Sequence, residues 1–261
     1  MQKMPLWFWV SVAFVAGAII GSFLNVVIYR VPEKKSLVKP PSHCPKCNAN
    51  IKPYDNIPIF SWLILGGHCR NCKQSISARY PIVEFITAVL YAAVVFTARP
   101  ITASLSECVA VSGMLVATVV DFERMRIPTK VIYATFLIGF PLLVVPTIQD
   151  GQWWRLGIAA ACGAGGGLVF FLFFLLLPPG GFGLGDVRLI AMQSAFLGWF
   201  GWRVAVSAVI VGFIAGGFIA MFLLATGIKK MKDKIPFGPY LALGALIMFY
   251  LVPVLPPKWI I

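Results

Sequence analysis

The chain has 261 residues, of which 59% are hydrophobic and only 12% are charged. Soluble domains carry charge on roughly a quarter of their residues, so this composition excludes a soluble globular protein and indicates one that spans a membrane. The net charge of +13 is explained by basic loops that face anionic lipid headgroups, so we expect membrane lipids and no nucleic acid as partners.

Eight apolar segments approach the length of about 20 residues that a membrane-spanning helix needs. They cover residues 6–28, 82–98, 105–120, 131–148, 156–177, 187–200, 203–226 and 237–254. We therefore predict an all-α polytopic membrane protein with about eight transmembrane helices. The first segment lacks a convincing signal-peptide cleavage site, so we expect it to be retained as a helix.

The basic residues predict the orientation of these helices. With eight spans, alternate loops lie on opposite sides of the membrane, and the loops of one side form a set that holds 17 of the 22 Lys and Arg residues. Loops rich in Lys and Arg stay in the cytoplasm. We therefore expect both termini to face outward and this set to face the cytoplasm: residues 30–81, 122–130, 178–188 and 227–236.

Residues 30–81 form the long hydrophilic stretch and contain two C-x-x-C pairs, Cys44 with Cys47 and Cys69 with Cys72. Such pairs are typical of a four-cysteine zinc ribbon, although the 21 intervening residues slightly exceed the usual separation of about 15–20. One tetrahedral Zn²⁺ would hold together a segment too small to build its own core. Two disulfides are the main alternative, and a redox pair is a weaker one; cytoplasmic thiols stay reduced, which favours the metal.

Two further features accompany these cysteine pairs. His43 and His68 each directly precede a pair, and either support or replace a thiolate or are ordinary loop residues. Between the pairs, residues 56–67 (NIPIFSWLILGG) are too apolar for a solvated loop and too short to span a membrane. We expect this stretch to pack against the cysteine segment or to lie on the membrane surface, where it could line a groove for a hydrophobic peptide.

Of the nine acidic residues, Asp121 and Asp186 lie where apolar segments meet the expected cytoplasmic surface. Asp55 is one of four other acidic residues whose side chains we expect to be exposed to solvent. Asp121 ends the run VSGMLVATVVD, where a carboxylate meets the negative end of the helix dipole and an apolar environment. Asp186 follows GGFGLG and could alone be explained as a helix N-cap. If the two helices adjoin, both acids share one pocket of low dielectric constant.

Two carboxylates a few ångströms apart cannot both ionise cheaply, so such a pair retains one proton. One can then take a proton from water while the other donates to a scissile carbonyl, which is aspartyl proteolysis without a covalent intermediate. The glycines at 180, 181, 183 and 185 would let an extended substrate backbone approach closely. Two alternatives remain open: a proton-coupled transporter, which favours acids nearer the bilayer midplane, and a non-catalytic scaffold.

Taken together, these features resemble the type IV prepilin peptidases, a family of bifunctional leader peptidases and N-methyltransferases. The resemblance covers nearly the whole chain and is carried by GSFLNVVIYRVP, the two C-x-x-C pairs, NIPIFSWL, ISARYPIVE, VVDFERMRIP, GLGDVRLIAM and IPFGPYLALGAL. It implies that Asp121 and Asp186 are the catalytic aspartates and that Gly183 and Gly185 belong to a G-x-G-D element. It also implies prepilin or pseudopilin substrates, cut after the glycine that ends a basic leader, at the bacterial inner membrane.

The resemblance further implies methylation of the new N-terminus from S-adenosylmethionine. It divides the chain into a first helix (1–29), a methyltransferase-associated cysteine domain (30–81) and a peptidase bundle (82–261). Glu84 is the candidate for holding the free amine, unless a nearby cation merely neutralises it. Gly66 and Gly67 either face the cofactor or simply form a hairpin turn. Arg188 replaces the usual lysine and either supports Asp186 or snorkels to the interface.

Overall fold

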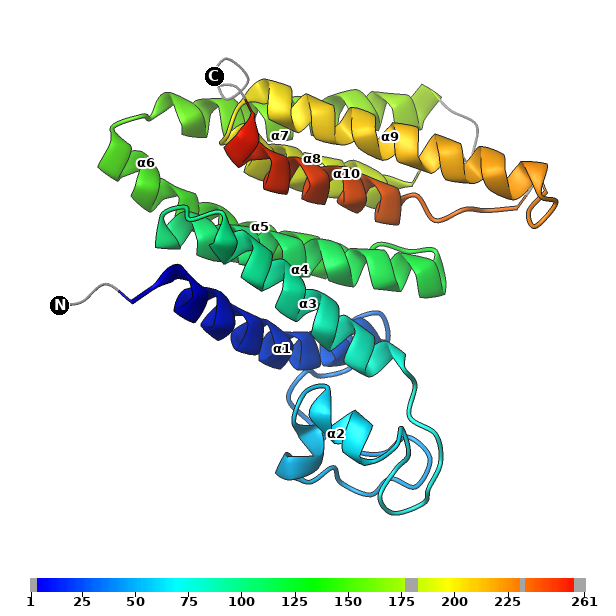
Figure 1. Ribbon diagram of the computed structural model, residues 1–261. Helices are drawn as coiled ribbons and strands as arrows, with labels where there is room; N and C mark the ends of the chain where they lie inside the picture. The colour runs from blue at the N-terminus through cyan, green and yellow to red at the C-terminus, as the bar shows by residue number, and fades with distance from the viewer. Residues whose placement is uncertain (1–3, 177–182, 231–232, 256–261) are drawn as a thin grey trace. The chain divides into compact units, whose positions relative to one another are not determined.

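The structure is a computed structural model of the chain, and it describes residues 4–176, 183–230 and 233–255 (Figure 1). Within these residues the fold is helical, which confirms the predicted class. The longest helices are α1 (Leu6–Arg30), α3 (Arg79–Phe96), α4 (Ile101–Arg124), α7 (Trp154–Leu176) and α9 (Trp202–Ala225). A further span is built from α5 (Thr129–Gly139), the 3-10 turn η2 (Phe140–Leu143) and α6 (Val144–Asp150).

These six segments, in the part of the chain that the structure describes, are long and apolar enough to cross a membrane. The other two predicted spans correspond to shorter helices, α8 (Leu184–Gly198, 15 residues) and α10 (Gly238–Leu251, 14 residues). A last 3-10 turn, η3 (Val252–Val254), extends α10. The estimate of about eight spans therefore matches eight helical segments of unequal length.

Backbone chemistry explains several of the boundaries. Pro141 lacks an amide hydrogen, so the regular helix gives way to a 3-10 turn between α5 and α6. Gly151 has a φ of 66° and ends α6, because glycine adopts the left-handed conformation without steric cost. Met125 takes the same conformation (φ 52°) at the end of α4, and its amide donates to the Asp121 carbonyl.

The chain divides into two compact units, one ending at Ala98 and one beginning at Arg99. In the first unit, α1 packs along α3 through small residues. A side-chain carbon on Gly17 would lie 2.7 Å from Ala88 Cα, and one on Gly21 would lie 2.6 Å from Glu84 Cα. Such close backbone approach is how helices associate in lipid. In the sequence, the two helices lie on either side of the cysteine segment, by which we mean the part of residues 30–81 between them. This segment also contains η1 (Pro53–Asn56) and α2 (Phe60–Ile64).

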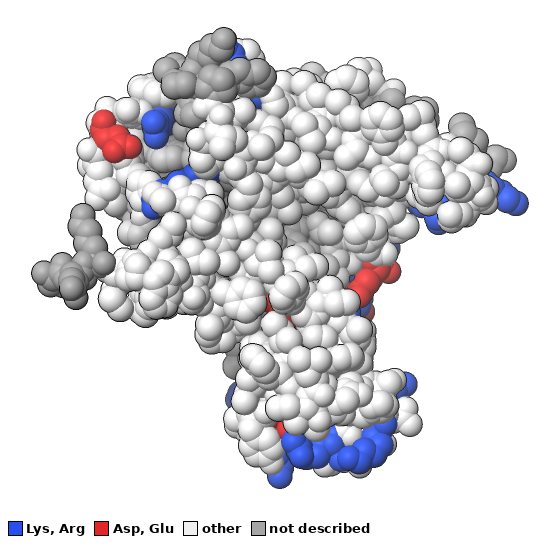
Figure 2. All heavy atoms as spheres, viewed as in Figure 1, with Lys and Arg blue, Asp and Glu red and all other residues white. Residues whose placement is uncertain are grey.

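The second unit has a buried centre made by α4, α8 and α10, with a core of large apolar side chains that includes Met114, Phe196, Leu241 and Phe249. By contrast, α7 and α9 expose most of their apolar side chains, as expected for helices that face lipid. On the face shown in Figure 2, charged side chains are rare over the helices and gather over the cysteine segment. The exposed basic residues of that segment include Lys46, Lys52, Arg70 and Lys73.

Candidate active site and cysteine cluster

Four helix ends of the second unit meet around Ile127, which lies in the loop between α4 and α5. A side-chain carbon on Gly185, in the first turn of α8, would lie 2.9 Å from Ile127 Cβ. One on Gly238, at the start of α10, would lie 3.0 Å from Ile127 Cδ1. The end of α4 and the starts of α5, α8 and α10 therefore converge here. Three helix N-termini bring positive dipole ends to this place.

Asp121 lies in the last turn of α4, and only 5% of the residue is exposed. Its Oδ2 accepts a hydrogen bond of 3.0 Å from the backbone amide of Gly238. This amide is one of the unpaired N–H groups at a helix start, so α10 supplies the stabilisation that the end of α4 denies. The residues next to Asp121 in the sequence do not stabilise its carboxylate, because the stabilising hydrogen bond comes from Gly238, which is distant in sequence.

Asp186 lies in the first turn of α8, and its Oδ2 accepts a 3.0 Å hydrogen bond from the Gly183 amide. Its own amide donates to the Gly183 carbonyl at 3.0 Å. The alternative that Asp186 is itself the N-cap is wrong, because α8 begins at Leu184 and Gly183 is the N-cap. Asp186 is the third helical residue and reaches back to the cap, as an acid does in a capping box.

Asp121 ends α4 and Asp186 begins α8, so the two acids lie at the helix junction around Ile127. Their helices contact each other, as the shared-pocket hypothesis required. Each carboxylate keeps one oxygen, Oδ1, outside the backbone hydrogen bonds described above. The structure thus brings the two predicted acids to one helix junction, and their joint action on a substrate stays a prediction. The glycines at 180 and 181 lie outside the described residues.

Arg188 does not simply extend toward solvent. Its Nη1 donates a 2.9 Å hydrogen bond to Thr129 Oγ1, the first residue of α5. This bond joins α8 to α5 one turn away from Gly185. Gly238, Ile127 and Thr129 were not predicted as site residues. A proline follows each of Ile127 and Gly238, and proline is typical of a helix start. This was the signal in the sequence that could have indicated helix N-termini at these positions.

The four cysteines of the first unit converge on one point. Their sulfur atoms all lie within 4.8 Å of one another, and Cys44 Sγ is 3.8 Å from Cys72 Sγ. A tetrahedral Zn²⁺ with Zn–S bonds of about 2.3 Å requires sulfurs about 3.8 Å apart. All six cysteines of the chain are described and carry free thiols, so the disulfide alternative is wrong for this structure. The donor set therefore fits zinc.

The two C-x-x-C pairs have the same local backbone. Asn48 and Lys73, each four residues after the first cysteine of a pair, have φ values of 57° and 55°. Their amides donate to the carbonyls of Cys44 and Cys69 at 2.9 and 3.0 Å. Hydrogen bonds to Cys69, first from the Cys72 backbone and then from Asn71, lower its pKa to about 7, which favours the thiolate that binds metal.

His43 and His68 bind backbone carbonyls instead of joining the sulfur cluster. The Nδ1 atom of His43 lies 2.9 Å from the Pro41 oxygen, and that of His68 lies 2.6 Å from the Gly66 oxygen. Among the described residues, the group with metal-ligand geometry contains the four cysteines alone. The replacement of a thiolate by histidine is therefore not supported by this geometry.

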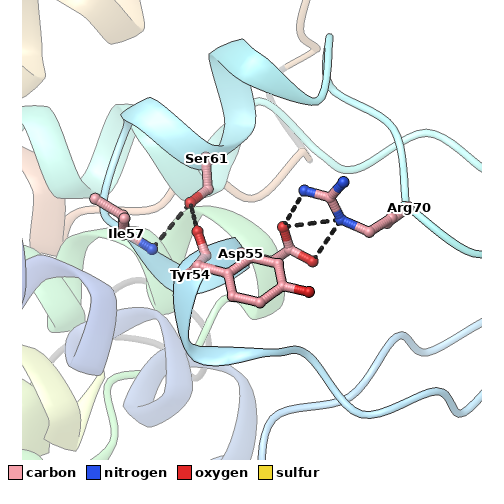
Figure 3. Close-up of polar contacts among 5 residues, drawn as sticks. All are labelled: Tyr54, Asp55, Ile57, Ser61 and Arg70. Carbon is pink, nitrogen blue, oxygen red and sulfur yellow. Dashed lines mark hydrogen bonds and ion pairs between the residues drawn. The ribbon is translucent and has the colours of Figure 1, made fainter.

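Asp55 is not freely solvated, so that expectation is wrong. Arg70, between the cysteines of the second pair, binds both of its carboxylate oxygens: Nη2 donates to Oδ1 at 2.6 Å and Nε to Oδ2 at 2.9 Å (Figure 3). The hydrogen bond from Arg70 lowers the pKa of Asp55. Ser61 Oγ accepts the Ile57 amide and donates to the Tyr54 carbonyl, both at 2.9 Å. The apolar stretch between the pairs is thus folded onto the cysteine segment.

The same stretch also exposes apolar side chains. The short helix α2 leaves Phe60, Leu63 and Ile64 at least 59% exposed, whereas Trp62 turns inward and donates to the Ile76 carbonyl at 3.1 Å. A side-chain carbon on Gly67 would lie 2.9 Å from the Trp62 ring. One side of the stretch therefore packs on the cysteine segment, as expected, and the other side exposes apolar side chains; its contact with a membrane surface stays a prediction.

Gly66 and Gly67 have φ values of 58° and 71° and form the turn that follows α2. The Gly67 amide donates to the Trp62 carbonyl at 2.9 Å, and its carbonyl accepts the Ile76 amide at 2.7 Å. The turn alone accounts for both glycines. Their contact with a cofactor stays a prediction.

Glu84 is buried near the start of α3. Its Oε2 accepts a 2.7 Å hydrogen bond from the Ile59 amide, and the Ser22 hydroxyl bonds to the same carboxylate. Glu84 therefore joins α1, α3 and the segment before α2.

These features define a multi-pass membrane protein with two acids at a junction of helix ends and a four-cysteine cluster. Residues 15–98 match the family model for the bacterial peptidase A24 N-terminal domain, and residues 108–225 match that for the type IV leader peptidase family. The chain belongs to the type IV leader peptidase family. No solved structure matches it.

Several curated relatives carry the name prepilin leader peptidase/N-methyltransferase. The one from Aeromonas hydrophila is 34% identical over 92% of this chain and 90% of its own length. That from Pectobacterium carotovorum subsp. carotovorum is 32% identical over 93% of each chain. That from Pseudomonas aeruginosa is 31% identical over 88% of this chain and 86% of its own. The similarity therefore spans both units.

Proposed function

We propose that this protein is a membrane-embedded aspartyl endopeptidase that removes the basic leader of prepilins or pseudopilins and N-methylates the new N-terminus. One observation carries the peptidase proposal: Asp121 and Asp186 lie at adjoining helix ends, each held by a backbone amide. A relay for proton transport needs no such pair at one helix junction. A general acid and a general base of proteolysis do.

The proposed chemistry uses the two carboxyl groups in turn. With one proton shared between them, the ionised group accepts a proton from a water molecule as the water oxygen bonds to the scissile carbonyl carbon. The protonated group donates to the carbonyl oxygen, which forms a tetrahedral diol. Collapse of the diol breaks the C–N bond as the leaving amine takes up a proton. The absence of a side chain at Gly185 lets α8 approach Ile127, and its absence at Gly183 leaves room for the Asp186 carboxylate.

The second activity is assigned to the first unit. The cysteine thiolates Cys44, Cys47, Cys69 and Cys72 would hold a structural Zn²⁺, which ties the two C-x-x-C pairs together. S-adenosylmethionine, when bound, supplies the methyl group that the free amine of the product receives. Glu84 fixes the position of the segment before α2. The basic loops favour an orientation in which both reactions occur at the cytoplasmic surface of the inner membrane.

The test is to incubate the purified protein with a prepilin-derived peptide and S-adenosylmethionine and to read the product masses. We expect a mature fragment that carries one added methyl group. Asp186→Asn should give no cleavage, and Asp150→Asn, a change at an exposed acid on α6, should cleave as wild type does. An intact peptide with wild-type protein would contradict the peptidase proposal, and cleavage without methyl gain would contradict the methyltransferase proposal alone.

A further inference from the structure

The first unit contains a cavity of about 510 Å³ beside the C-terminal half of α1. Its wall on α1 includes Ile19, Phe23, Val26 and Arg30, so it changes from apolar to cationic along the helix. The remaining wall comes from two separate segments, residues 37–42 and 56–58. Small-molecule sites have volumes of about 300–1,000 Å³ and are mostly apolar with a few placed polar groups. This cavity has both properties.

Arg30 fixes the first of these segments. The residue is only 8% exposed, and its guanidinium donates to the Ser36 carbonyl at 2.9 Å and to the Pro40 carbonyl at 2.6 Å. A guanidinium has five N–H groups, so donors beyond these two are left for an anion. Arg30 thus shapes the wall and brings a positive charge to it.

Glu84 fixes the second segment from behind. It binds the Ile59 amide directly after Ile57 and Pro58 of the cavity wall, and also binds Ser22, which lines the cavity from α1. Ile59 has a φ of 63°, which a β-branched residue rarely adopts. A buried carboxylate that holds a strained backbone against α1 indicates a wall that is formed before any ligand arrives.

We propose that this cavity is the S-adenosylmethionine site of the methyltransferase, with Glu84 as a positioning residue; the inference rests on the proposed function. The lining offers partners for three parts of that molecule. Arg30 suits the carboxylate of the methionine part, Asn56 and Ser42 suit ribose hydroxyls and the adenine edge, and Phe23 offers an aromatic surface for the base. The site replaces Gly66 and Gly67 as the expected contacts, because neither lines this cavity.

A phospholipid headgroup is the competing occupant, since the apolar end of the cavity lies on a membrane-spanning helix. The test therefore measures binding of S-adenosylhomocysteine by titration calorimetry, with purified full-length protein in a lipid-free detergent. Val26→Trp fills the cavity without removing a charge, and Arg30→Met removes the cation. Val15→Trp is the matched control: it makes the same change on α1 at a residue that is 58% exposed and outside the cavity.

We expect Val26→Trp and Arg30→Met each to weaken binding by about tenfold or more, in line with the loss of a charged hydrogen bond or of the space for the ligand. Val15→Trp should bind as wild type does, and all variants should retain zinc, which shows that the unit is folded. Light-induced cross-linking of radiolabelled S-adenosylmethionine should label peptides from α1 or residues 37–58 in the wild type and not in Val26→Trp.

Wild-type affinity in Val26→Trp, or cross-links elsewhere in the chain, would overturn the site. So would variants that lose co-purified anionic lipid while their affinity for S-adenosylhomocysteine is unchanged. These failures differ from failure of the proposed function. If only the site is wrong, the wild-type protein still methylates the cleaved peptide. If the proposed methyltransferase function is wrong, the wild-type protein neither methylates the peptide nor binds S-adenosylhomocysteine.

Discussion

Replacing Gly238 by alanine should slow leader cleavage while leaving the protein folded. The added carbon would lie 2.9 Å from Asp121 Oδ2 and 3.0 Å from Ile127 Cδ1, closer than such contacts normally occur. The carboxylate is the end of a short side chain and can move, so the clash is relieved by displacing Asp121 from the Gly238 amide. A hydrogen bond to a charged group contributes about 1.5–3 kcal/mol. The cleavage rate should therefore fall by about 10- to 150-fold.

The assay is the initial rate of cleavage of a prepilin peptide at saturating substrate, with melting temperature as the measure of folding. Gly217→Ala is the matched control, since Gly217 lies within α9 and an added carbon there meets nothing within 4 Å. Alanine is the better helix former, so the control should be as active as wild type and at least as stable. Wild-type rates in Gly238→Ala would refute the view that the start of α10 positions Asp121.

Three further outcomes follow from the contacts of the two units. Cys44→Ser should release the metal, so that mass spectrometry finds about one zinc per wild-type chain and none in the variant; zinc-free wild type would contradict the site. Glu107→Gln should destabilise the second unit by about 3–5 kcal/mol, because it breaks the buried ion pair with Arg99; an unchanged melting temperature would contradict this. The pKa of Asp55 is lowered in the folded state, so its ion pair with Arg70 stabilises the fold fully above the unfolded-state pKa of about 4. This stabilisation is lost as the pH falls through the folded-state pKa. The difference in melting temperature between wild type and Asp55→Asn should therefore shrink below about pH 4 and not above it.

The helices could be predicted because long apolar runs have few other solutions in a membrane. Their ends could not be predicted as well. The sequence suggested that one span ends at 120, yet α4 continues to Arg124 and takes Asp121 into its last turn. The sequence also did not show the 3-10 turn around Pro141. The last turn of α4 is polar but closes on its own C-cap, where the Met125 amide bonds to the Asp121 carbonyl. The 3-10 turn arises because Pro141 lacks an amide hydrogen.

The types of site residue could be predicted, but their partners could not. The metal-binding role of the two C-x-x-C pairs could be predicted from their spacing, because each pair forms a local turn that presents two sulfurs. Asp121 depends instead on an amide 117 positions away, at Gly238. Asp55 was assigned to solvent because Arg70, 15 residues on, becomes its neighbour only after the segment folds. Tertiary hydrogen bonds leave no periodic pattern in a sequence.

The most direct test of the central claim compares cleavage rates of Asp121→Asn, Asp186→Asn and the double variant with that of the wild type. If the two carboxylates share one proton and act as a unit, each single change should remove nearly all activity, and the double change should cost little more than either one. Substantial cleavage by either single variant, or losses that add in the double variant, would contradict the shared-proton pair.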